Sequence, residues 1–167
     1  MTFKRGSFKI NRRTSDNMFK PFFASTFFLF WAAMTQAQET QANKSAETRG
    51  EVVAITAENY QKEVLESKLP VVLDYFSVWC PPCQVARPIF EEVTRKYAGR
   101  VKFGRVDGDK DEKFADQQKI EIYPTFVFIN NGREVFRAGG GPRNDKQSKN
   151  EFRQGLKEAI EKYLLAR

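Results

Sequence analysis

The chain has 167 residues, a net charge of +7 and a pI near 9.5, with two cysteines and no histidine. The charge is uneven, because residues 1–37 hold six Lys or Arg side chains and one acidic side chain. The rest holds 22 basic and 20 acidic side chains and no basic run interleaved with aromatics, so we expect no nucleic-acid partner. Without histidine or a second cysteine pair, no metal site is expected either.

Residues 1–37 have the order of a secretory signal peptide. Lys20 precedes an apolar run, and Thr35-Gln36-Ala37 places small residues at the positions that a signal peptidase reads. The run is shorter than the roughly 20 residues of a spanning helix, although an uncleaved anchor remains an alternative. Met18 would start a more compact signal. We therefore expect a periplasmic or otherwise exported protein, held to a membrane only if this segment is retained.

Residues 38–50 are polar and have no large apolar side chain, which predicts a disordered linker. Residues 51–167 are then enough for one domain. It begins with a short strand, Val52–Ile55, followed by a helix over about Ala57–Ser67, for which Thr56 is the candidate N-cap. Pro70 would stop this helix before the next strand.

The most informative stretch follows. Val71–Phe76 is a mainly apolar run that is typical of a buried parallel strand, and the motif Trp79-Cys80-Pro81-Pro82-Cys83 comes directly after it. Beyond the motif the apolar spacing becomes helical as far as Tyr97, with Pro88 expected to interrupt and kink the helix. Cys80 is therefore expected at a strand-to-helix turn, where free N–H groups favour the thiolate that attacks disulfides.

The remaining elements alternate again. We expect a strand, a short helix, a hairpin across Asn131-Gly132 and a closing amphipathic helix, over Val101–Asp107, Asp111–Lys119, Ile122–Asn130 with Glu134–Arg137, and Asn150–Leu165. The polar stretch Gly139–Lys149 is expected to be a loop, and its role is left open.

These motifs resemble those of the thioredoxin family. Asp74 lies six residues before the first cysteine and Pro88 five after the second, as the buried acid and the helix-kinking proline of the family do. Ile122-Tyr123-Pro124-Thr125 resembles its cis-proline segment, and Asn130-Asn131-Gly132 its hairpin turn. The resemblance covers about Val52–Leu165. It implies an α/β thioredoxin fold, with a central mixed sheet flanked by helices on both faces.

The resemblance also implies catalytic roles. Cys80 would attack a substrate disulfide, Cys83 would resolve the mixed disulfide, and Asp74, buried beneath the pair, would accept the Cys83 proton. The redox-active Cys80–Cys83 pair would need no other cofactor. The family often has a lysine near the buried acid, and our alignment places Phe103 there instead.

Five further residues are expected around the dithiol. Pro81 and Pro82 would form the active-site turn, and the backbone of Tyr123 would pair with an extended substrate strand because Pro124 is cis. Trp79 is expected over the turn, with substrate contact and core packing as equal alternatives.

The function expected from these features is that of an exported thiol:disulfide oxidoreductase that reduces protein disulfides. Pro81 has no N–H to stabilise the Cys80 thiolate, which favours a reducing couple over an oxidising one. A membrane-bound electron donor and a monomeric state are expected with it. The alternatives are a dithiol oxidase or isomerase, and a non-catalytic module that binds chains in the groove beside Pro124. An inert disulfide is disfavoured, because so small a loop restricts the unfolded chain little.

Overall fold

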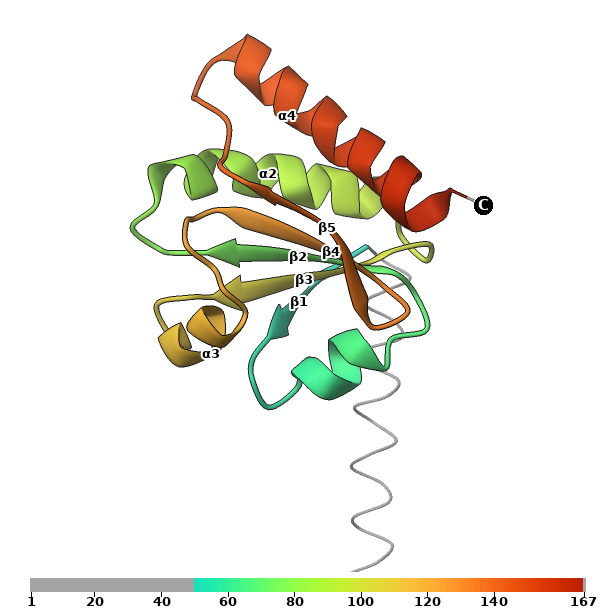
Figure 1. Cartoon of the computed structure of the whole chain (residues 1–167). Helices are drawn as coiled ribbons and strands as arrows, with labels where there is room; N and C mark the ends of the chain where they lie inside the picture. The colour runs from blue at the N-terminus through green and yellow to red at the C-terminus, as the bar shows by residue number, and fades with distance from the viewer. Residues whose placement is uncertain (1–49, 167) are drawn as a thin grey trace, which may run out of the picture. The chain divides into compact units, whose positions relative to one another are not determined.

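The computed structural model describes residues 50–166, so the predicted signal peptide and all of the predicted linker except Gly50 lie outside the described residues. The described part is built on a five-stranded sheet in the order β1-β3-β2-β4-β5 (Figure 1). The strands are β1 (Val52–Ile55), β2 (Val71–Phe76), β3 (Lys102–Asp107), β4 (Thr125–Asn130) and β5 (Arg133–Gly139). The first three are parallel to one another, whereas β4 and β5 are antiparallel to their neighbours.

Helices cover both faces of this sheet. They are α2 (Pro81–Lys96), α3 (Glu112–Gln117) and α4 (Lys146–Ala159), with two π-helical segments, η1 (Gln61–Leu65) and η2 (Ile160–Leu165). Figure 1 shows α2 and α4 together on one face and α3 on the other. Helices on both faces of a mixed sheet confirm the predicted α/β thioredoxin fold. Between residues 50 and 166, no helix is long and apolar enough to cross a membrane.

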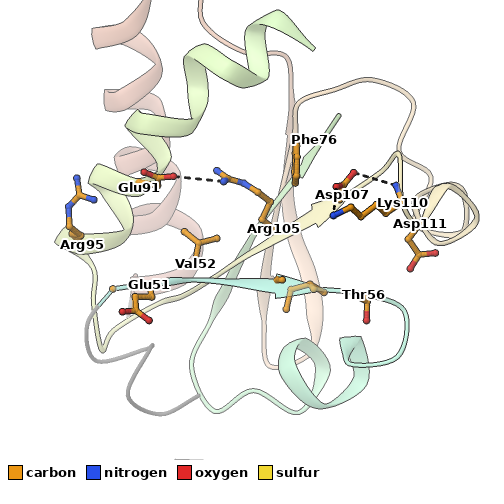
Figure 2. A pocket seen from close by; sticks show the side chains of 13 residues that line it. Glu51, Val52, Thr56, Phe76, Glu91, Arg95, Arg105, Asp107, Lys110 and Asp111 are labelled. Atoms are coloured by element: carbon orange, nitrogen blue, oxygen red, sulfur yellow. Dashed lines mark hydrogen bonds and ion pairs between the residues drawn. The ribbon is translucent and has the colours of Figure 1, made fainter. Parts of the chain in front are cut away.

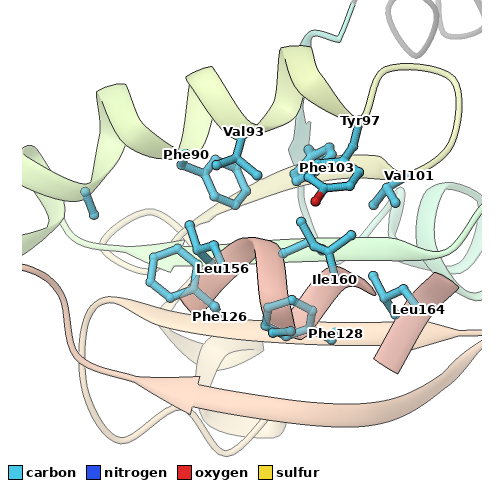
Figure 3. Close-up of a cluster of buried hydrophobic side chains, with 13 residues drawn as sticks. Phe90, Val93, Tyr97, Val101, Phe103, Phe126, Phe128, Leu156, Ile160 and Leu164 are labelled. Atoms are coloured by element: carbon cyan, nitrogen blue, oxygen red, sulfur yellow. The ribbon is translucent and has the colours of Figure 1, made fainter. Parts of the chain in front are cut away.

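Strand β2 contributes to a separate core on each face of the sheet. Val72 packs beneath α2 and α4 in a cluster rich in phenylalanine (Figure 3), whereas Val71, Leu73 and Tyr75 pack against η1 and α3. A strand buried on both faces reads as a continuous apolar run rather than an alternating one. This is why β2 and its direction were predictable from the sequence.

Two predicted helices differ from those observed. At the start of the domain, the helix expected over Ala57–Ser67 is only the short η1. It begins after Tyr60 rather than Thr56 and has no side-chain cap. The last helix starts earlier than expected. Asp145 caps it by accepting a hydrogen bond from the N–H of Ser148 at 2.8 Å, so its first turn occupies part of the predicted loop.

Two predicted element boundaries near prolines are also corrected. Helix α2 continues through Pro88 to Lys96 without the predicted interruption. Strand β4 starts at Thr125 rather than Ile122, because the cis peptide bond between Tyr123 and Pro124 precedes the sheet pairing.

Candidate active site

The two cysteines form a disulfide at the N-terminus of α2, immediately after the carboxyl end of β2. Cys80 is the N-cap residue, and its sulfur accepts a hydrogen bond from the N–H of Cys83 at 3.2 Å. Pro81 and Pro82 fill the first two helical positions, where a missing N–H costs no helical hydrogen bond. Cys80 is half-buried, whereas Cys83 is only 6% exposed, so an incoming group reaches the first cysteine more easily.

A cavity of about 360 Å³ links Cys83 to the buried acid. Its lining includes Asp74, Cys83, Gln84 and Arg105. Asp74 is 3% exposed, and burial raises the pKa of its carboxyl above 3.8, although Arg105 opposes this shift. A carboxylate with a raised pKa beside a thiol is suited to accept a proton from it.

Arg105 is the partner of Asp74, and it is not among the site residues predicted from the sequence. The Nε of Arg105 donates to Asp74 Oδ2 at 2.9 Å, because the parallel register of β2 and β3 pairs these two residues directly. Phe103, which the alignment placed near Asp74, lies two residues before Arg105 on β3. It pairs with Val72 instead. The available signal was a charged side chain in the interior of β3, between Gly104 and Val106. Arg105 also lies over the ring of Phe76, with its Cζ 5.3 Å from the centroid.

The ion pair between Asp74 and Arg105 is incomplete. Within residues 50–166, Asp74 Oδ1 and Arg105 Nη2 are the only buried side-chain nitrogen or oxygen atoms without a hydrogen-bond partner. Native proteins contain few such atoms, and a catalytic role, local strain or an ordered water accounts for those that occur. Asp74 Oδ1 is therefore an open acceptor beside the cavity that reaches Cys83.

Arg105 also lines a second, larger cavity of about 690 Å³ beside strand β1. Figure 2 shows its side chain between Phe76 and Glu91, whose Oε1 lies 3.9 Å from Arg105 Nη1. The buried acid is thus connected, through one guanidinium group, to a carboxylate at the protein surface.

Trp79 is 85% exposed, which excludes the core-packing alternative for its side chain. Val78 and Ile122 are also exposed apolar residues next to the motif and the cis-proline segment. An exposed aromatic side chain next to a reactive cysteine is available to contact a bound partner.

The cis-proline segment packs against the segment that follows β5. The peptide bond between Tyr123 and Pro124 is cis, and Pro124 O accepts a hydrogen bond from the N–H of Gly140 at 2.8 Å. A Cβ atom on Gly141 would lie 3.0 Å from both Pro124 Cγ and Pro82 Cβ. The segment after β5 therefore packs closely against both the motif and the cis-proline, and a side chain at position 141 would require Pro82 or Pro124 to shift.

Acidic and sulfur side chains do not gather into a candidate metal site in the described part of the chain. Between residues 50 and 166, no group of three or more cysteine, aspartate or glutamate side chains could hold a metal ion.

Comparisons with known proteins agree with this geometry. The thioredoxin family model matches residues 51–158. Thioredoxin C-2 of Corynebacterium nephridii is 35% identical over 94 residues, which are 56% of this chain and 87% of that protein. The thioredoxin of Buchnera aphidicola is 31% identical over 106 residues, 64% of this chain and 97% of that one.

A solved structure is similar as well. The crystal structure of Malassezia sympodialis thioredoxin has a TM-score of 0.56 and 32% identity, covering 70% of this chain and 93% of that one. The shared fold and the C-x-x-C pair carry the activity of the family, which acts on protein disulfides. This chain belongs to the thioredoxin family and is a thiol-disulfide oxidoreductase.

Proposed function

We propose that this protein is an exported reductant of protein disulfides, with Trp79-Cys80-Pro81-Pro82-Cys83 as its active site. The observation that carries the proposal is a half-exposed cysteine joined to a buried one, which shares a cavity with an unsatisfied carboxylate oxygen. This arrangement provides one sulfur for attack and a second, protected sulfur with its own proton acceptor.

The reaction starts with the reduced pair. The Cys80 thiolate attacks one sulfur of a substrate disulfide, and the other sulfur leaves as a thiolate that takes a proton from solvent. Cys83 then gives its proton to Asp74 Oδ1, directly or through water in the cavity, and attacks Cys80 Sγ in the mixed disulfide. The second substrate sulfur leaves as a thiolate and takes a proton from solvent, while Asp74 returns its proton to solvent. The substrate has gained two electrons, and Cys80 and Cys83, which have lost them, are joined as a disulfide.

The reducing direction is supported by the donors around Cys80. A strong oxidant has a stabilised thiolate in its reduced form. Here Pro81 and Pro82 contribute no N–H, and the N–H of Cys83 is the hydrogen-bond donor to Cys80 Sγ. The chain also has no histidine that could add a positive charge between the cysteines. A thiolate with so few stabilising groups favours a reducing couple.

Export is supported by the sequence order of residues 1–37. Compartments outside the cytoplasm are oxidising, so a dithiol that works there as a reductant must be reduced again by a dedicated donor. We place the protein in the periplasm as a monomer, with envelope proteins as substrates and a membrane-bound protein as electron donor.

Trapping the mixed disulfide tests this proposal. Cys83→Ser should accumulate disulfide-linked adducts with envelope proteins that dissociate when a thiol is added, because the resolving sulfur is missing. Cys80→Ser should form no adducts and should not reduce insulin. If Cys83→Ser turns over like the wild type, the roles of the two cysteines are misassigned. A wild-type protein that binds chains without reducing insulin would be a binding module instead.

A further inference from the structure

The loop between β3 and α3 holds the segment that leads into the active site. Ser77 Oγ donates a hydrogen bond to the carboxylate of Asp109, with both oxygens at 3.0 Å, and the N–H of Val78 donates to Asp109 Oδ2 at 2.7 Å. Asp109 lies 31 residues from Val78 in the sequence, so this contact joins two separate parts of the chain.

These hydrogen bonds continue toward the nucleophile. The N–H of Trp79 donates to Ser77 Oγ at 3.3 Å, and the N–H of Cys80 donates to Ser77 O at 3.3 Å. Because the Trp79 side chain is exposed, its place depends on the backbone that carries it. Asp109 is therefore connected by hydrogen bonds through Ser77 to the backbone of both Trp79 and Cys80.

The Asp109 loop is itself fixed on two sides. The N–H of Asp109 donates to Asp107 Oδ1 at 3.1 Å, and the N–H of Gly108 donates to Phe76 O at 2.9 Å, at the end of β2. A Cβ atom on Gly108 would clash with the hydroxyl oxygen of Tyr123, so the loop also touches the residue before the cis-proline. The loop thus contacts both the end of β2, which leads to the cysteines, and the residue before the cis-proline.

We propose that Asp109 is a positioning residue for dithiol–disulfide exchange, whose carboxylate holds the Ser77–Cys80 turn so that Trp79 and Cys80 meet the substrate disulfide in a fixed orientation. This inference rests on the proposed function and adds a residue to its site. Sulfur exchange needs the attacking sulfur aligned with the substrate bond, and misplacement by about 1 Å can cost about a hundredfold in rate.

The experiment uses the full-length protein with Trp31→Phe, which leaves Trp79 as the sole tryptophan. Asp109→Ala removes the acceptor, whereas Asp109→Asn keeps an acceptor oxygen for Val78 and loses only the charge. Asp116→Ala is the matched control, because it removes an exposed carboxylate of the same loop-helix region that does not contact the turn. Insulin reduction gives kcat and KM, and the fluorescence anisotropy of Trp79 reports on its mobility.

Asp109→Ala is expected to lower kcat/KM about tenfold, with lower Trp79 anisotropy, because the turn loses two of its anchors. Asp109→Asn should stay within about twofold of the wild type, since an amide oxygen also accepts hydrogen bonds. Asp116→Ala should behave like the wild type in both measurements. Equal losses in Asp109→Ala and Asp116→Ala, or in Asp109→Ala and Asp109→Asn, would show a charge effect and overturn the proposal.

Ser77→Ala provides a second variant in case Asp109→Ala does not fold. It keeps the bond from Val78 and should give an intermediate loss of kcat/KM and of anisotropy; wild-type values in both would overturn the proposal. Failure of the proposed function is recognised separately, because the parent protein would then not reduce insulin. In that case the anisotropy and the rate of Cys80 alkylation by iodoacetamide still test the positioning role, since neither needs turnover.

Discussion

Two buried ion pairs involve strand β3, one on each face of the sheet, and they differ in how fully they are satisfied. Lys102 Nζ lies 2.6 Å from Glu63 Oε2, with side chains 4% and 9% exposed, and neither residue has a buried atom without a partner among residues 50–166. In the other pair, both Asp74 and Arg105 keep one buried atom unpartnered. Asp74 and Arg105 line a cavity together with Cys83.

This difference indicates that the Lys102–Glu63 pair stabilises the fold, whereas the Asp74–Arg105 pair takes part in the reaction. A buried pair whose atoms are all satisfied has no acceptor to offer a new proton, and breaking it leaves an uncompensated charge. An open carboxylate oxygen beside a thiol can take a proton without first breaking a hydrogen bond. We therefore expect substitutions at Glu63–Lys102 to change stability and substitutions at Asp74–Arg105 to change the reaction.

The largest expected effect is on stability, at the satisfied pair. Lys102→Met should lower the free energy of unfolding by about 3–5 kcal/mol, because Glu63 stays buried without its ammonium partner. The insulin-reduction rate per folded molecule should be unchanged. Arg100→Met, which breaks an exposed pair with Glu161, should cost less than about 1 kcal/mol. Denaturant unfolding measures both, and equal losses would remove the distinction between buried and exposed pairs.

The next effect is on catalysis, at the open pair. Asp74→Asn should slow resolution of the mixed disulfide by about a hundredfold, the lower end of what a positioned proton acceptor contributes. Substrate binding should change little, since Asp74 lies beneath the cysteines rather than in the groove. Stopped-flow measurement separates the two steps, and an unchanged resolution rate would place Asp74 outside the mechanism.

A third effect concerns the pH dependence of stability. Burial raises the pKa of Asp74 above 3.8 in the folded protein, so the wild type loses stability as the pH rises from 3.8 through the folded-state pKa. Asp74→Asn carries no such loss. Loss of the pair with Arg105 lowers the melting temperature of this variant, but the melting temperature relative to that of the wild type should rise as the pH increases from 3.8. A difference that does not vary with pH would contradict the raised pKa.

The smallest effect is expected at Arg105. Its guanidinium lowers the pKa of Asp74 against the effect of burial. In Arg105→Met this pKa should rise further, so the carboxylate accepts protons only at higher pH. The pH profile of the resolution step should then shift toward alkaline values, with a loss of a few-fold near neutral pH. Arg105→Lys keeps the charge and should shift the profile less; equal shifts would show that the charge of Arg105 does not matter.

The sequence predicted the fold and the cysteine geometry well, because these depend on local patterns. The apolar run of β2, the prolines at the start of α2 and the segment before Pro124 each indicate one structure. Arg105 and Asp109 were missed because their roles depend on strand register and loop contact. Phe103 and Arg105 lie on the same face of β3, and the sequence does not say which of them stands beside Asp74.

Helix ends were the other weak point, for a similar reason. The early start of α4 depends on the bond from Ser148 to Asp145, within a polar stretch that has no apolar period to mark it. The short η1 shows the reverse case, in which a good amphipathic pattern forms little more than one helical turn.

The central claim is that the Cys80–Cys83 pair is a reducing couple, and its reduction potential tests this most directly. Equilibration of the full-length protein with glutathione buffers, followed by thiol trapping, gives the value. We expect a potential close to that of thioredoxin, about −270 mV, rather than that of strong exported oxidants, about −120 mV. A potential above about −170 mV would contradict the account and make the protein an oxidase.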